Sequence, residues 1–110
     1  QMSDQDVFVN VVGEVKVSET SADLALLMSL VSSLRDRPLP NDLVVFGEVG
    51  LAGEIRPVPS GQERISEAAK HGFKRAIVPH GNMPKKPPAN MQVFGVKKLA
   101  DALDVLEEFY

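Results

Sequence analysis

The sequence places a serine and a glutamine at the starts of two helical segments, where reactive side chains often stand. Ser21 precedes an apolar run that extends to about Leu34, and Gln62 lies on the first turn of a shorter segment. A serine hydroxyl becomes a nucleophile near neutral pH only when a neighbouring base removes its proton. The amide of Gln62 cannot take up that proton. Ser21 is therefore interpreted as either a residual nucleophile or a helix N-cap.

Lys16 is the residue nearest to Ser21 along the chain that could serve as such a base. It alternates with Val15 and Val17 in an extended pattern, which places its side chain on the solvent face. A solvated lysine keeps a pKa of about 10.4 and stays protonated at neutral pH. For Gln62 two interpretations stay open, namely a hydrogen bond across a subunit contact and a solvated position on the first turn.

The composition of the chain and the motifs it lacks argue against several other kinds of site. The chain has 110 residues, 44% of them hydrophobic, a net charge of −3 and no cysteine. This length fits one domain, and the lack of cysteine fits a reducing, cytoplasmic compartment. His71 and His80 stand apart from other metal ligands, so we expect no metal site. No apolar run approaches the length of a membrane span. A Walker-type phosphate loop does not occur in the sequence either, so we expect no nucleotide cofactor here.

Basic residues supply the other candidate chemistry, which is contact with the phosphates of DNA. Phosphate binding needs only cationic side chains that face the duplex, and an acidic chain can carry a local basic patch. Some of these cations follow helices, where they also complement the helix dipole. The DNA-binding candidates are Arg35, Arg37, Lys70, Lys74, Arg75, Lys85 and Lys86.

Periodicity predicts the elements that must position these residues. Residues 7–17 keep a period of two and predict a strand, or a strand pair bent at Gly13. The following helix is predicted to end near Leu34. Its inner face is predicted to hold Leu24, Leu27, Met28, Val31 and Leu34. Because Leu26 and Leu30 are apolar too, this helix is expected either in the centre of the domain or at a subunit contact.

The second half of the chain is predicted to contain alternating strands and helices. Two strands joined near residues 51–53 precede a helix that Ser60 and Glu63 are predicted to begin as a capping box and Gly72 to end. Short strands at 75–79 and 92–96 flank a proline-rich loop, and residues 98–109 form the last helix. The predicted fold is α+β, with a two-layer arrangement of a mixed sheet and helices mainly on one side.

The run "GEVGLAGEIRPV" and the later "ERISEAAKHGFKRAIVP" resemble the proteolytic domain of the Lon protease family. The matching residues are Gly47, Glu48, Leu51, Gly53, Ile55, Pro57 and Val58, followed by Glu63, Ala68, Gly72, Lys74, Ile77 and Pro79. Lon-type enzymes use a serine–lysine pair. The resemblance puts Ser21 in the place of the serine and Gln62 in the place of the lysine, and Asp23 where a glycine is usual. It implies a Lon-like fold whose catalytic pair is degenerate, so the domain is expected not to be an enzyme.

The same runs, with "VSSLRDRPLP", resemble more closely the carboxy-terminal Lon-like domain of the RadA (Sms) family of bacterial DNA repair proteins. This resemblance implies a longer ATPase chain in which residues 1–6 are a flexible lead-in and 7–110 are the Lon-like domain. It implies ATP, Mg and Zn for that longer chain only. It also implies a hexameric ring as self-assembly, contact with single- or double-stranded DNA and with a recombinase, and a scaffold role during branch migration.

Two alternatives to this scaffold role remain open. One is an active Lon-type serine peptidase, which would need a base for Ser21. The other is a protein-docking adaptor that acts through the acidic residues of the last helix, which are Asp101, Asp104, Glu107 and Glu108.

Overall fold

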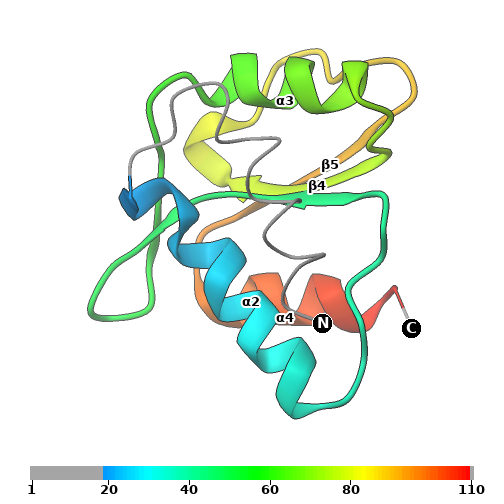
Figure 1. Ribbon diagram of the computed structural model, residues 1–110. Helices are drawn as coiled ribbons and strands as arrows, with labels where there is room; N and C mark the ends of the chain where they lie inside the picture. The colour runs from blue at the N-terminus through cyan, green and yellow to red at the C-terminus, as the bar shows by residue number, and fades with distance from the viewer. Residues whose placement is uncertain (1–18, 110) are drawn as a thin grey trace.

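The computed structural model describes residues 19–109, which form helices above and below a small sheet (Figure 1). The predicted strand at 7–17, Lys16 and the boundary between residues 6 and 7 lie outside the described residues. The helical elements are η1 (Glu19–Ala22), α2 (Asp23–Leu34), α3 (Gly61–Lys70), η2 (His80–Asn82) and α4 (Leu99–Glu107). The strands are β1 (Leu43–Val45), β2 (Glu48–Val49), β3 (Ile55–Arg56), β4 (Arg75–Pro79) and β5 (Gln92–Val96).

The strands form two separate sheets. β1, β4 and β5 lie side by side in this order and are parallel, with Val44 opposite Ala76 and Ala76 opposite Val93. β2 and β3 form an antiparallel hairpin in which Glu48 faces Arg56. The predicted pair of strands joined near residues 51–53 is confirmed as this hairpin. Parallel and antiparallel pairs both occur, which is compatible with the α+β class.

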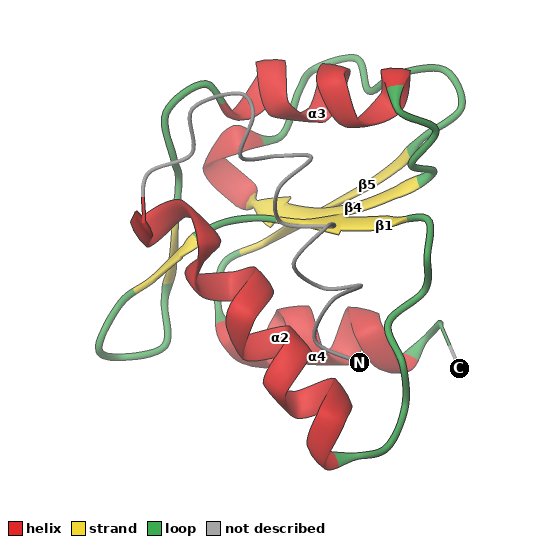
Figure 2. Ribbon diagram, in the orientation of Figure 1, coloured by secondary structure: helices red, strands yellow, loops and turns green. Residues whose placement is uncertain are grey.

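Helices cover both faces of the parallel sheet, so the predicted two-layer arrangement is wrong. Figure 2 shows α3 on one side of β1, β4 and β5, and α2 and α4 on the other. Val44 and Ala76 belong to the core under α3, whereas Val45 and Ile77 belong to the core against α2 and α4. Continuous apolar strands such as residues 43–46 and 76–78 are typical of a sheet buried on both faces, and the sequence prediction overlooked this signal.

α2 packs on the sheet with a face that differs from the predicted one. Leu24 and Met28 are fully buried as expected, but Leu34 is 77% exposed. The helix also buries Ala25, Ser29 and Ser32. Leu26 and Leu30 remain 56% and 55% exposed and, with Leu34, form an apolar stripe at a spacing of four residues.

α3 begins without the capping box that Ser60 and Glu63 were expected to form. Ser60 has a φ of 58°, in the left-handed region, and its side chain makes no cap hydrogen bond. A capping serine normally keeps an extended backbone, so the left-handed conformation of Ser60 departs from the geometry that a capping box needs. The end of α3 agrees with the prediction, because Gly72 follows it with a φ of 89°. The short strands at 75–79 and 92–96 and the last helix are also confirmed.

Candidate nucleic-acid interface

The two residues that the Lon resemblance assigns to a degenerate catalytic pair lie in different settings. Ser21 lies in η1, is fully buried, and its carbonyl accepts the N–H of Gly47 at 2.9 Å. The N-cap of α2 is Ala22, so the interpretation of Ser21 as the cap is wrong; the extra turn of η1 moves the helix start past it. Gln62 lies on α3 with an exposed side chain and lines a groove.

Asp23 also has a structural partner. Its Oδ2 accepts the backbone N–H of Val49 at 3.3 Å and so links the first turn of α2 to the hairpin. The carboxylate thereby satisfies a backbone donor of β2, and it adds favourable negative charge at a helix N-terminus. This contact gives Asp23 a role in the fold that does not depend on any reaction at Ser21.

The three candidate arginines gather around the end of α4 and are engaged within the domain. Arg35 and Arg37 both pair with Glu107, with an Nη1–Oε1 distance of 2.9 Å for Arg37. Arg75 donates to Asp42 Oδ1 from Nε at 3.2 Å and from Nη2 at 2.7 Å. Its guanidinium also lies 4.4 Å from the centre of the Phe109 ring. We call Arg35, Arg37 and Arg75 the arginine cluster.

The four candidate lysines, in contrast, are exposed and have no ion-pair partner among residues 19–109. They are Lys70, Lys74, Lys85 and Lys86, which we call the lysine face. Lys70 ends α3, Lys74 precedes β4, and Lys85 and Lys86 lie in the loop that runs beside α3 (Figure 1). Within residues 19–109 no ion pair involves any of these four ammonium groups. The structure thus divides the predicted DNA-binding residues into an engaged set and an available set.

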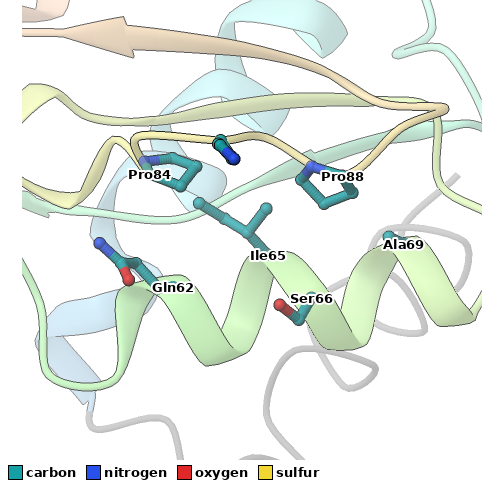
Figure 3. A pocket seen from close by; sticks show the side chains of 7 residues that line it. Gln62, Ile65, Ser66, Ala69, Pro84 and Pro88 are labelled. Atoms are coloured by element: carbon teal, nitrogen blue, oxygen red, sulfur yellow. The ribbon is translucent and has the colours of Figure 1, made fainter.

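A groove of about 310 Å³ opens between α3 and the proline-rich loop. Gln62, Ile65, Ser66 and Ala69 line it from the helix. Pro84, Lys86 and Pro88 line it from the loop. In Figure 3 the side chain of Ile65 points from α3 toward the loop, between the rings of Pro84 and Pro88. The groove therefore has an apolar floor with one amide, one hydroxyl and one ammonium group at its rim.

Hydrogen bonds and close packing hold the loop in place at its start. Asn82 donates to the Val58 carbonyl at 3.1 Å and accepts the Val58 N–H at 2.8 Å. This side chain lies so close to Gly61 that a Cβ there would come within 2.3 Å of its Nδ2. Gly61 is therefore required for α3 to start beside the loop. At the far end Met91 donates its N–H to Pro88 at 3.1 Å.

Arg64 is a buried residue that the sequence prediction overlooked. Its side chain is only 2% exposed, its Nε donates to the Pro59 carbonyl at 3.0 Å, and its guanidinium lies 5.8 Å from the Phe46 ring. Nη1 has no hydrogen-bond partner within the described part of the chain. Burial lowers the pKa of this guanidinium from its ordinary value. The sequence signal for the burial of Arg64 is its position one residue before Ile65 and four before Ala68. This position lies on the inner face of α3.

Further observations concern metal sites and membrane-spanning helices, neither of which the sequence predicts. His71 has an acidic neighbour that the sequence prediction overlooked, since its Nε2 lies 3.2 Å from Glu67 Oε2. No group of three or more metal-ligating side chains occurs among residues 19–109. In the same part of the chain, none of the helices combines the length and the apolar character that crossing a bilayer requires.

Comparison with known proteins places these features in a family. A family model described as "Subunit ChlI of Mg-chelatase" matches residues 1–82. The chain belongs to this ChlI family. Its curated relatives include the DNA repair protein RadA of Salmonella typhimurium, 84% identical over 108 residues, and that of Escherichia coli, 82% identical over the same length. RadA of Aquifex aeolicus is 46% identical over 103 residues.

This ChlI-family chain is much shorter than those relatives. The alignments cover 98% of the chain in the Salmonella and Escherichia matches and 94% in the Aquifex match, but only 24% and 23% of the relatives. The chain thus spans about a quarter of the length of the curated relatives it matches. Such identity supports a fragment of a RadA-family protein, as the resemblance predicted. The narrower assignment to a Lon-like domain stays a prediction.

Proposed function

We propose that this chain is a non-proteolytic, DNA-contacting domain of a RadA-type DNA repair protein, and that the lysine face makes the contact. The names of the relatives support the repair role. The observation that carries the contact is the difference between the two sets of cations. Arg35, Arg37 and Arg75 have carboxylate partners, whereas the four lysines are exposed and have none in the described part of the chain. An unpaired ammonium group can release counterions from a phosphate without first breaking an internal ion pair.

A pair of double variants tests this proposal. Replacing Lys85 and Lys86 by alanine is expected to lower the slope of log affinity against log salt by about 1.4 for single-stranded DNA, if each lysine neutralises one phosphate. Replacing Lys97 and Lys98 by alanine is the matched control, because these are also adjacent, exposed lysines after β5 and neither lines the groove. Fluorescence anisotropy at several salt concentrations measures both slopes. Equal slopes for the two double variants would contradict the lysine face as the contact surface.

Assembly is the second part of the proposed role, and the apolar stripe on α2 supports it. Leu26, Leu30 and Leu34 are each more than half exposed, and solvent-exposed leucines at this spacing are typical of a surface that another chain covers. In a hexameric scaffold this stripe would contribute to the contact between domains. Sedimentation at increasing concentration is expected to show self-association of the chain that Leu30→Glu weakens. Unchanged sedimentation of the variant would remove the stripe from the assembly.

The other roles implied by the resemblance belong to the longer protein in this proposal. ATP, Mg and Zn would bind outside these residues, and the recombinase contact and branch migration would be activities of the assembled protein. The peptidase alternative has less support because Ser21 is fully buried. The adaptor alternative retains Asp101, Asp104 and Glu108 as exposed acidic residues, while Glu107 is engaged by the arginine cluster.

A further inference from the structure

We infer that the groove between α3 and the proline-rich loop is a pocket for one unstacked base of single-stranded DNA. This inference rests on the proposed contact with DNA and names where one nucleotide would sit. The volume of about 310 Å³ lies at the lower end of the range for sites that hold small molecules. The lining has the composition of such sites, with apolar side chains and a few polar groups.

The apolar part of the groove fits the faces of a flat base. Ile65 closes the bottom of the groove and is itself only 1% exposed, so the accessible apolar surface belongs to the half-buried Ala69, Pro84 and Pro88 (Figure 3). A base that lies on this surface exchanges water for aliphatic contacts, which favours binding through the apolar area removed from water. The contact is independent of sequence to a first approximation, because every base has a flat face.

The polar groups at the rim of the groove suit the base edge and the phosphate of a nucleotide. Gln62 carries both a donor and an acceptor, so its amide can bond to the edge of any of the four bases. Lys86 supplies a positive charge at the rim, Lys85 lies next to it, and none of the lining residues carries a carboxylate. The charge of the groove thus favours an anionic ligand with an apolar, planar part. This assignment gives the exposed amide of Gln62 a chemical role.

A peptide is the competing occupant, and the loop offers little for a peptide backbone to pair with. Pro84, Pro87 and Pro88 have no N–H, and extended peptides gain much of their affinity from main-chain hydrogen bonds. The helix side adds no free backbone groups, since its interior N–H groups are bonded within α3. A nucleobase needs neither main-chain hydrogen bonds from the loop nor free backbone groups on the helix. The observations therefore favour a nucleobase over an acidic peptide.

The experiment compares a ten-residue thymidine oligonucleotide with an abasic oligonucleotide of the same length and charge, on the whole 110-residue chain. We expect the thymidine oligonucleotide to bind about tenfold more tightly, because the base and the groove remove apolar surface from water. Ser66→Phe fills the groove and is expected to reduce the affinity for thymidine to that for the abasic strand. Ser33→Phe is the matched control, the same change at an exposed helix serine on α2, and is expected to alter neither affinity.

The outcomes separate this inference from the proposed function. Equal affinity for the two oligonucleotides would overturn the base pocket while leaving the phosphate contact in place. If neither strand binds, both the pocket and the proposed function fail. If deca-glutamate binds and Ser66→Phe weakens that binding more than it weakens thymidine binding, the groove is a peptide site and the inference is wrong. Circular dichroism of each variant checks that the fold is retained.

Discussion

The arginine cluster and the lysine face have the same sign of charge but different surroundings. Around the end of α4, each arginine meets a carboxylate, and Arg75 also covers the ring of Phe109. Beside α3 the lysines point into solvent from a helix end and a proline-stiffened loop. The planar guanidinium suits bidentate pairing, whereas the ammonium group is a strongly hydrated point charge. The comparison indicates that the arginines hold elements together and that the lysines remain available to an external anion.

Arg75→Ala should give the largest effect within this comparison, and the effect should be on stability. The substitution removes two hydrogen bonds to Asp42 and the contact with Phe109. Because the pair is partly buried and bidentate on the arginine side, we expect the free energy of unfolding to fall by about 2 kcal/mol. Urea denaturation measures this change. DNA affinity measured at a temperature where the variant is folded should stay unchanged, and a loss as large as that of the Lys85/Lys86 variant would break the division between the two regions.

Lys70→Ala combined with Lys74→Ala should leave the free energy of unfolding nearly unchanged and weaken the binding of DNA. Neither side chain has an ion-pair partner within residues 19–109, so the free energy of unfolding should change by less than about 0.5 kcal/mol. The salt slope for single-stranded DNA should fall by up to about 1.4 if both lysines reach phosphates. A slope equal to that of the unaltered chain would restrict the lysine face to Lys85 and Lys86.

Some parts of the candidate site could be predicted from the sequence and others could not. The seven cations, the proline-rich loop and the position of Gln62 on the first turn of α3 follow from residue types and short-range periodicity. The division of the cations does not, because Glu107 is 72 and 70 residues from its two arginine partners along the chain. The groove also depends on contacts between α3 and a loop about twenty residues later. Nothing in the local pattern indicates that Pro84 and Pro88 lie opposite Ile65.

The sequence alone determined the helices, the short buried strands and the lack of a base at position 62, because these depend on residue type and on periods of two and about 3.6 residues. Only the tertiary structure decided that helices cover both faces of the sheet. It also decided that Ser21 is buried within η1, and that Arg64 is buried on the inner face of α3. These outcomes depend on which distant segments pack together. Packing is set by the fit of whole surfaces, which a local pattern of residues does not contain.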